Sequence, residues 1–234
     1  MQNYNNEAVT TFRGLPWFEM TNDMYCTIGG AGGIGSWLAL FLSRAGIKPT
    51  IYDFDYVERR NMGGQFYSQE DIGRPKVQAL ASNIRNFTAY WYPSVYETRL
   101  QEGSQQSSMS FSAFDNMEAR KTMFKNWKRV VARMRPEEQY KAIFIDGRLE
   151  AEFFQIFCVT TNRIEQYEAT LVDDSELPDT ACTVKQTTHV AAMIGAYMTT
   201  LFTNHLTNIA EKGKVREVPF KFEVFLPLIT TYEE

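Results

Sequence analysis

The 234 residues of the chain are 44% hydrophobic and 22% charged, the composition of an ordinary globular protein that can bury a sizeable core. The formal net charge of -4 gives no reason to expect nucleic-acid binding by the chain as a whole. No apolar run approaches the roughly 18 residues of a membrane span, and the 3 cysteines cannot build a disulfide framework or a four-thiolate zinc site, so we expect a cytoplasmic protein with free thiols.

Taken in chain order, short β-rich runs alternate with amphipathic helical patterns. Strands are expected at residues 24–29, 49–53, 94–100, 109–114, 141–145 and 153–159. Helices are expected from a glycine cluster to residue 46, and at residues 75–85, 118–131 and 189–209. Residues 215–228 predict a closing pair of strands. This alternation predicts an α/β fold, with a Rossmann-like, mostly parallel sheet covered by helices on both faces.

The length of the chain favours a single domain. We divide it into an N-terminal arm (1–22), a core (23–171), a crossover loop (172–188), and a C-terminal helix with closing strands (189–234). The crossover loop is acidic and then polar, and it has neither a helical nor a strand period. It therefore separates the core from the C-terminal elements.

The glycine cluster has the spacing Gly30-x-Gly32-x-x-Gly35 and lies between a predicted strand and a predicted helix. Glycines allow a tight turn and close approach of the backbone to a phosphate, and the helix N-terminus supplies free N–H groups. Asp53 ends the next predicted strand, where a carboxylate can accept hydrogen bonds from ribose hydroxyls. The pattern predicts a nucleotide site in the core. The alternative is that the glycines serve only close packing of helix and strand.

The glycine cluster and acid alone would also suit an NAD- or FAD-dependent oxidoreductase. Three further motifs follow, however, and a dinucleotide site does not require them. They read DFDYVERRNMGGQF at residues 53–66, DIGRPK at 71–76 and FDNMEAR at 114–120. Charged residues at fixed places after the acid indicate a different use of the nucleotide.

In this order the motifs resemble the ThiF/MoeB/ubiquitin-activating-enzyme superfamily, and in particular its short phage and bacterial members. The family pattern is a glycine loop, Asp-x-Asp-x-Val-x-x-x-Asn-Leu-x-Arg-Gln-Phe, Gly-x-Pro-Lys, and a strand ending in Asp-Asn with Glu-Ala-Arg shortly after. The match runs from about residue 24 to residue 120 and continues more weakly to residue 189. Several ordered motifs at compatible spacing are far more specific than the glycine cluster alone.

The resemblance implies an ATP-dependent enzyme that adenylates the C-terminal carboxylate of a ubiquitin-like or sulfur-carrier protein ending in glycine. It implies that Asp53 binds the ribose, that Lys76 contacts phosphate, and that Asp115 positions Mg²⁺ and the attacking carboxylate. The implied nucleotide-binding set is Gly30, Gly32, Gly33, Gly35, Asp53, Asp55, Asn61, Gln65, Lys76, Arg13 and Arg60. The chemistry agrees, because a cation, a metal ion and backbone dipoles would offset the repulsion between a carboxylate and a nucleotide. For Lys76 the alternative is a solvated helix lysine, and for Asp115 a helix N-cap.

One position departs from the family pattern. The arginine before Gln65 is replaced by Gly64. Arg59 or Arg60 could compensate, and so could Arg13, because dimers of the family often insert an N-terminal arginine into the neighbouring subunit. The resemblance thus also implies a homodimer. Without such compensation the protein would be a scaffold that keeps the fold but does not turn over ATP.

Cys182 lies in the sequence DTACTVKQT, which resembles the Cys-Thr-Ile-x-x-Thr segment around the catalytic cysteine of ubiquitin-like-modifier activating enzymes. By that resemblance Cys182 would accept the acyl group as a thioester. The alternative is an incidental or buried cysteine. Cys26 and Cys158 lie in apolar strands and are expected in the core.

Two further features carry less chemistry. Arg148 and Glu152 follow a predicted strand and could form a polar cluster near the site or an ordinary structural ion pair. His189 and His205 share one predicted helix but form no set of metal ligands, and the chain has no Cys-x-x-Cys pair for zinc. The resemblance implies a carboxylate-bearing protein and a second copy of the chain as partners, and we expect no nucleic acid and no membrane.

Overall fold

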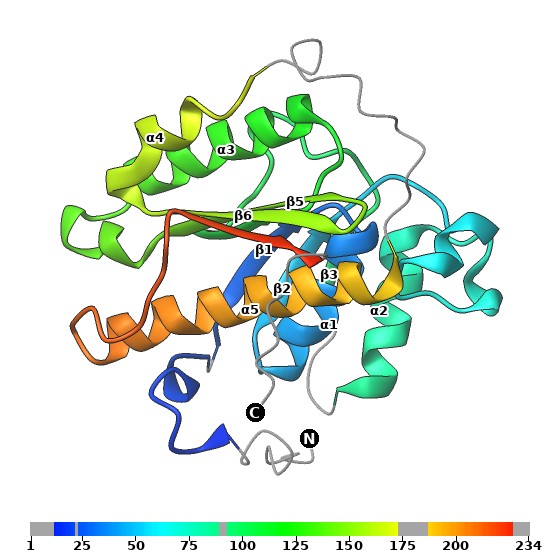
Figure 1. The fold of residues 1–234 in the computed structure, drawn as a ribbon, viewed down its shortest axis with the longest axis horizontal. Coiled ribbons are helices and arrows are strands. Elements are labelled where there is room, and N and C mark those ends of the chain that lie inside the picture. The colour runs from blue at the N-terminus through cyan, green and yellow to red at the C-terminus, as the bar shows by residue number, and fades with distance from the viewer. Residues whose placement is uncertain (1–11, 22, 89–92, 173–186, 227–234) are drawn as a thin grey trace.

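The computed structural model describes residues 12–21, 23–88, 93–172 and 187–226 (Figure 1). Within these residues the chain forms a 7-stranded sheet in the order β3-β2-β1-β4-β5-β6-β7. The strands are β1 (Tyr25–Gly29), β2 (Lys48–Tyr52), β3 (Ser94–Tyr96), β4 (Met109–Ser112), β5 (Ile143–Glu150), β6 (Phe153–Val159) and β7 (Lys221–Phe225). The α-helices are α1 (Gly33–Arg44), α2 (Lys76–Phe87), α3 (Met117–Ala132), α4 (Ile164–Glu168) and α5 (Thr188–Ala210). Short 3₁₀ helices are η2 (Phe18–Thr21), η3 (Arg59–Gly63), η4 (Gln69–Asp71), η5 (Pro136–Lys141) and η6 (Thr161–Arg163).

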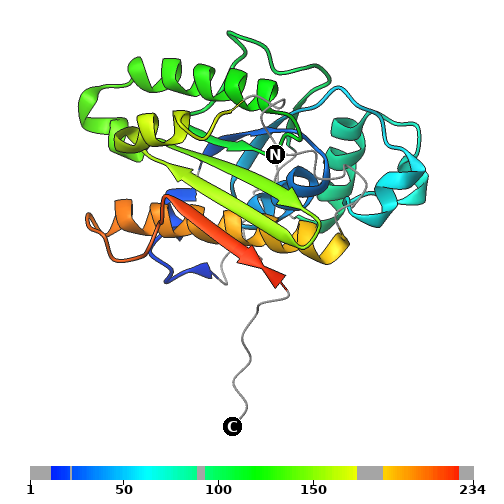
Figure 2. The ribbon, with the colours of Figure 1, turned by 45° about the horizontal axis from the view of Figure 1, so that its top comes forward.

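The sheet has a parallel and an antiparallel part. Neighbouring strands from β3 to β5 are parallel, whereas β6 pairs antiparallel with both β5 and β7 (Figure 2). The predicted α/β fold with a mostly parallel sheet is thus confirmed. Since β2, β1 and β4 run in the same direction as neighbours, the segments that follow them meet at one edge of the sheet.

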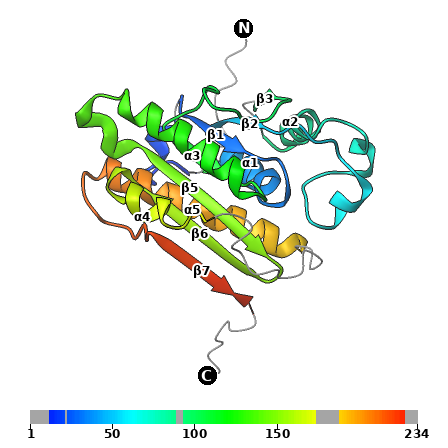
Figure 3. The same ribbon diagram turned by 90° about the horizontal axis from the view of Figure 1, so that it is seen from above.

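Helices cover both faces of the sheet, as the sequence predicts. Helices α1 and α5 lie on one face with α2 beside α1, and α3 and α4 lie on the other (Figures 1 and 3). Side chains of β5 alternate between the two layers, because successive residues of a strand point to opposite faces. Ile143 and Ile145 join the core with α1 and α5, and Phe144 joins the core with Phe124 and Trp127 of α3.

Helices α1 and α5 approach each other closely at Gly195. A Cβ atom at Gly195 would lie 3.1 Å from the backbone nitrogen of Leu38 and 3.3 Å from the Cβ of Trp37. The glycine therefore sets the spacing of the helix pair. None of the helices in the described part of the chain has the length and apolar character needed to cross a lipid bilayer.

Two expected boundaries are wrong. Strand β5 continues to Glu150, so residues Asp146 and Arg148 lie inside the strand rather than after it, because β6 pairs with β5 along its whole length. Between residues 215 and 226 the chain forms one strand, β7, instead of a strand pair. Val215 and Arg216 cannot form a second strand there, because their backbone N–H groups donate to Oδ1 of Asn208 on α5.

Candidate functional site

The glycine loop connects β1 to α1 at the edge of the sheet where β2 and β4 also end. Gly30 has a φ of +94°, and a Cβ at Gly35 would lie 1.9 Å from the carbonyl oxygen of Gly30. These two glycines are therefore required by the turn and by packing, as the alternative interpretation holds. A Cβ at Gly32, in contrast, would meet nothing within 4 Å. Packing does not explain Gly32.

The open space at Gly32 adjoins the first turn of α1. Gly33 is the first residue of the helix, and Gly32 is its N-cap and provides no side-chain hydrogen bond. No acidic side chain lies in the first turn. Backbone N–H groups at such a helix end, together with the positive end of the helix dipole, suit an anionic group such as a phosphate.

The backbone of Ala31, inside the loop, is held from two sides. Its N–H donates to Oδ2 of Asp53 at 2.7 Å, and its carbonyl accepts from the Tyr67 hydroxyl at 2.7 Å. Burial, together with the nearby Asp53 carboxylate, raises the pKa of Tyr67 well above its ordinary value, so the hydroxyl stays a donor. Oδ1 of Asp53 also accepts from the N–H of Asp55 at 2.8 Å. Asp53 thus fixes the loop, a role that the sequence did not indicate.

Lys76 is the first residue of α2 and is 8% exposed. Its Nζ lies 3.0 Å from Oδ2 of Asp55, and its N–H donates to the Asp55 carbonyl at 2.8 Å. The Tyr67 hydroxyl also lies 3.4 Å from the Lys76 carbonyl. The alternative of a solvated helix lysine is wrong, because the side chain is buried and paired at the edge of the sheet that carries the glycine loop.

Asp71 organises the segment that leads into Lys76, and the sequence assigned it no role. Its carboxylate, 1% exposed, accepts hydrogen bonds from Ser68, Arg74 and Asn83 at 2.7–3.0 Å. Burial acts to raise the pKa of Asp71, but the hydrogen bonds from Asn83 and Ser68 and the charge of Arg74 keep it below its ordinary value. This buried anion holds the turn between η4 and α2.

Asn61 and Arg60 are both engaged with Glu58 in the segment around η3. Oδ1 of Asn61 accepts from the Glu58 N–H at 2.7 Å, and Nε of Arg60 lies 2.7 Å from the Glu58 carboxylate. Oε1 of Gln65 is buried without a hydrogen-bond partner among the described residues. Of these three predicted residues, Gln65 is the one with an unused buried acceptor.

Gly64, which replaces the family arginine, is buried. Its carbonyl accepts from the Trp37 indole at 3.1 Å, and the Gly63 carbonyl accepts from the Thr188 hydroxyl at 2.8 Å. The segment after η3 is therefore tied to the first residue of α5 and to α1. In Figure 1 it lies on the same side of the molecule as the start of α5.

Asp115 follows β4 and is exposed. The N–H of Ala113 donates to the Gly29 carbonyl at 2.8 Å, which places this segment beside the glycine loop. The alternative of an N-cap role for Asp115 is wrong, because Asn116 caps α3 through a 2.9 Å bond from the Ala119 N–H. The carboxylate of Asp115 makes one described contact, a 3.2 Å hydrogen bond from the amide of Asn116.

One predicted residue within the described ranges, Arg13, is not brought to this edge. Arg13 is exposed, and the segment that carries it leads into the start of β1, at the opposite end of the strand from the glycine loop (Figure 1). Cys182 lies outside the described residues. Cys26 and Cys158 are fully buried, as predicted, and burial raises the pKa of both thiols, that of Cys158 to about 12.

Of the two interpretations of Arg148, a polar cluster near the site or a structural ion pair, the structure shows the ion pair. Nε of Arg148 lies 2.8 Å from Oδ2 of Asp146, which also faces Arg120 of α3 at 3.3 Å. Glu152 lies in the turn between β5 and β6, and its backbone carbonyl accepts from the Leu226 N–H at 3.1 Å. The predicted ion pair between Arg148 and a carboxylate is confirmed, and the carboxylate is that of Asp146.

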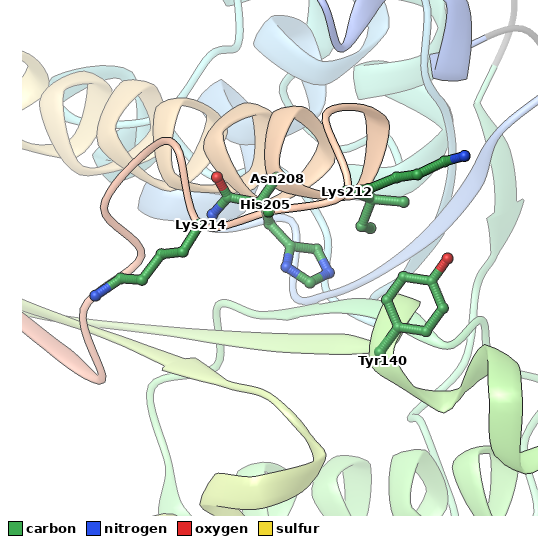
Figure 4. A pocket seen from close by; sticks show the side chains of 7 residues that line it. Tyr140, His205, Asn208, Lys212 and Lys214 are labelled. Carbon is green, nitrogen blue, oxygen red and sulfur yellow. The ribbon is translucent and has the colours of Figure 1, made fainter.

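A cavity of about 400 Å³ lies at the far end of α5, away from the glycine loop. Its lining residues are Tyr140, His205, Asn208, Ile209, Lys212, Gly213 and Lys214. Figure 4 shows the ring of His205 directed from α5 into the space beside Tyr140. Since none of the predicted site residues lines this cavity, we assign the chemistry to the sheet edge, where helix terminus, lysine and carboxylates are found together.

No group of three or more His, Cys, Asp or Glu residues in the described ranges could hold a metal ion. A resident metal centre is therefore not indicated there. Mg²⁺ that arrives with a nucleotide needs only one or two protein carboxylates, because phosphates and water complete its coordination. The exposed Asp115 carboxylate at the sheet edge fits that requirement.

The sequence is similar to curated proteins named ubiquitin-like modifier-activating enzyme 5. It is 32% identical over 123 residues to the ubiquitin-like modifier-activating enzyme 5 of Drosophila mojavensis, a match that covers 44% of this chain and 30% of that protein. The protein of the same name from Gallus gallus is 39% identical over 70 residues, or 30% of this chain and 18% of the relative. The matched part is thus less than a third of these relatives.

The fold is similar to solved structures over most of the chain. PaaA has a TM-score of 0.68 at 18% identity and covers 94% of this chain and 66% of its own. TcdA, the tRNA N6-threonylcarbamoyladenosine dehydratase of E. coli, has a TM-score of 0.65 at 17% identity, with 87% and 94% covered. MccB of E. coli has a TM-score of 0.63 at 14% identity, with 92% and 64% covered.

A family model matches a much longer part of the chain than any of the curated relatives above. The model of the ThiF family matches residues 5–223, which include every described motif from the glycine loop to β7. The chain therefore belongs to the ThiF family.

Proposed function

We propose that the protein activates a carboxylate as an acyl-adenylate. An oxygen of the carboxylate attacks the α-phosphorus of ATP, the bond to the β-phosphate oxygen breaks, and pyrophosphate leaves. The observation that carries the proposal is the open space at Gly32, beside an uncapped helix N-terminus and on the edge that holds Lys76 and Asp115. TcdA and MccB, both similar in fold, have been solved with ATP, which supports the choice of nucleotide.

In this proposal the backbone of the glycine loop binds the phosphates, and Asp53 accepts hydrogen bonds from the ribose while it holds Ala31. Each carboxylate oxygen can accept more than one hydrogen bond, so both roles are compatible. Lys76 neutralises phosphate charge. Its ammonium group has three donors, which lets it retain Asp55 while it contacts a phosphate.

Asp115 would hold Mg²⁺ together with the nucleotide and orient the incoming carboxylate. When bound, the metal ion neutralises charge on the phosphate oxygens during the displacement. Asn61 and Gln65 would line the nucleotide pocket. The buried Oε1 of Gln65 has no hydrogen-bond partner among the described residues, and a donor group of the nucleotide would satisfy it.

The substrate class we propose is a ubiquitin-like or sulfur-carrier protein that ends in glycine, because the curated relatives are named ubiquitin-like modifier-activating enzymes. A second step follows from the sequence around Cys182. Its thiolate would attack the acyl carbon, the bond to AMP would break, and a thioester and free AMP would form. Mass spectrometry of the Cys182→Ser variant, with ATP and partner present, should show no thioester adduct where the original chain shows one.

A homodimer belongs to the same proposal. Arg13 lies in the segment that precedes β1, whereas the glycine loop follows β1, so we expect any contact of Arg13 with phosphate to be made in a second subunit. Arg59 and Arg60 are the nearer candidates to replace the missing arginine at Gly64. Light scattering of the purified protein, followed by mixing of an Arg13→Ala variant with a Lys76→Ala variant, would show whether the two defects complement each other across an interface.

The test of the adenylation proposal uses two buried lysines, Lys76 at the start of α2 and Lys48 at the start of β2. Lys76 and Lys48 are 8% and 7% exposed, and each contacts an aspartate, Asp55 or Asp23. With Mg-ATP and the carrier protein, Lys76→Ala should lower pyrophosphate exchange by roughly 100-fold, because a charge that stabilises the transition state is lost. Lys48→Ala should leave exchange within about threefold, since a group away from the site changes stability alone.

Three other results would redirect the assignment. Absence of Mg-ATP binding in calorimetry would favour the scaffold alternative that Gly64 motivates. Tighter binding of NAD than of ATP in a nucleotide panel would favour the oxidoreductase. Equal losses of exchange in the two lysine variants would remove Lys76 from the chemistry.

A further inference from the structure

Arg120 is a buried cation behind the loop that carries Asp115. We propose that Arg120 is a positioning residue for the adenylation reaction: it fixes the backbone beside Asp115 and so sets the direction of that carboxylate. The inference rests on the proposed function. It assigns a role to a residue whose side chain is 8% exposed and does not itself reach the open surface of the site.

The contacts of Arg120 join three parts of the fold. One guanidinium nitrogen donates to the carbonyl of Phe114, the residue before Asp115, and lies 3.4 Å from the Gly147 carbonyl. The other lies 3.3 Å and 3.4 Å from the two oxygens of Asp146. The side chain starts on α3, so one group ties helix, loop and strand together.

Asp146 gives this arrangement a rigid base. It is fully buried on β5 and accepts a 2.8 Å hydrogen bond from Nε of Arg148. Arg148 in turn donates to the carbonyl and hydroxyl of Thr170 at 3.3 Å and 3.0 Å and stacks on Phe157 at 4.4 Å. Burying two cations with one anion is costly unless each donor finds a partner.

The loop shows what the buried arginine achieves. Pairing of β4 with β5 ends at Ser112, so the carbonyl of Phe114 has no strand partner. The Phe114 ring packs against Gly29, where a Cβ would lie 2.3 Å from it, and Asn116 caps α3. Both neighbours of Asp115 are therefore fixed, and the carboxylate between them makes a single described hydrogen bond, from the amide of Asn116. The position of the acid is set mainly through the backbone, which leaves most of its acceptor capacity for a ligand.

Arginine is the residue that can do this. Its planar fork presents donors in fixed directions to a carbonyl and a carboxylate at once, whereas lysine offers a point charge. Arg120→Lys therefore keeps the positive charge but loses the hydrogen bond to the Phe114 carbonyl. Arg148→Lys is the matched control, because it weakens a hydrogen bond to the same buried Asp146 and leaves the hydrogen bond to the Phe114 carbonyl in place.

The experiment compares the two variants by two measurements. Hydrogen–deuterium exchange should rise in the peptide covering residues 113–119 for Arg120→Lys and stay at the original level for Arg148→Lys. In pyrophosphate exchange, Arg120→Lys should lower kcat by roughly 100-fold, the cost of a misplaced catalytic group, with the Kd for Mg-ATP within about threefold. Arg148→Lys should keep kcat within about threefold.

Equal kcat losses in the two variants, or unchanged deuterium uptake in the 113–119 peptide of Arg120→Lys, would overturn the proposal. If Arg120→Lys does not fold, Arg120→Gln replaces it, with the same expected results, since the shorter and uncharged side chain cannot bridge the Phe114 carbonyl and Asp146 at once. Should the original protein show no exchange with any carrier, the proposed function fails. The deuterium uptake then decides by itself whether Arg120 holds the loop.

Discussion

At the scale of single residues, the glycine loop contains two kinds of glycine that the sequence cannot tell apart. Gly35 has no room for a side chain, because a Cβ would lie 1.9 Å from a backbone oxygen. Gly32 has room for a Cβ, and its φ of -79° lies outside the left-handed region that favours glycine. Since neither packing nor a positive φ explains this glycine, we explain it by the close approach of the proposed ligand.

This difference gives a prediction with its own control. Gly32→Ala should weaken ATP binding about tenfold or more, equivalent to about 1.4 kcal/mol, because the methyl group occupies the space of a phosphate. Its Tm should stay close to that of the original chain. Gly35→Ala should instead lower stability by about 1–3 kcal/mol through overpacking. Calorimetry with Mg-ATP and thermal unfolding separate the two, and a loss of Tm in Gly32→Ala would contradict the assignment.

Spacing in the sequence identified the charged residues of the candidate site. Asp53, Lys76 and Asp115 each follow a strand or begin a helix, so their common edge could be inferred from the order of the elements. Tyr67 and Arg120 could not be inferred as supports in the same way. Their partners are the carbonyls of Ala31 and Phe114, and a backbone atom leaves no pattern in the sequence.

At the scale of elements, the turn from η4 to α2 depends on Asp71. Its pKa is lowered in the folded state, so its contribution to stability is fully present above the unfolded pKa of about 4 and is lost as the pH falls through the folded pKa. Protonation of Asp71 at low pH should therefore weaken the turn that positions Lys76.

We expect Asp71→Asn to lower the free energy of unfolding at pH 7 by about 1–3 kcal/mol, because it weakens several hydrogen bonds to a buried anion. The difference from the original chain should shrink as the pH is lowered below about 4, where the reference protein itself becomes protonated at this site. Urea titrations at pH 7 and pH 3 measure the change, with the exposed Glu70→Gln as control. A difference that is independent of pH would show that the charge of Asp71 does not matter.

The strands and helices were largely readable from the sequence, but the direction of β6 was not. The run FFQIFCV is apolar on both faces, which suits either a parallel or an antiparallel buried strand. The short turn at Ala151, with a φ of +52°, decides it by returning the chain directly alongside β5. The sequence analysis also placed Asp146 and Arg148 after the strand. Charged residues fit inside a buried strand only when other elements supply their partners, and the sequence does not show those partners.

At the scale of the whole molecule, two thiols lie in the apolar core next to the sheet. Cys26 on β1 and Cys158 on β6 are far apart in the sequence, yet both are fully buried in the core on the α1 and α5 side. Burial raises the pKa of each, which removes the reactive thiolate. Their modification requires the core to open.

Alkylation of the native protein at pH 8 should therefore leave Cys26 and Cys158 unmodified, and both should react at the rate of global unfolding. Peptide mass spectrometry after timed labelling, with a urea-denatured sample as the fully reactive control, gives the rate at each site. Rapid labelling of either cysteine in the folded protein would mean that the core on the α1 and α5 side opens locally, without global unfolding.

The double hold on Ala31 has a kinetic meaning. The N–H of Ala31 is held by Asp53, which follows β2, and its carbonyl is held by Tyr67, which precedes α2. In the proposed nucleotide site the loop is therefore ordered when the chain folds, and binding would not have to pay the entropy cost of ordering it. Association should then be a single collision-limited event without a slow rearrangement, and the protein would discriminate among nucleotides by shape from the first encounter.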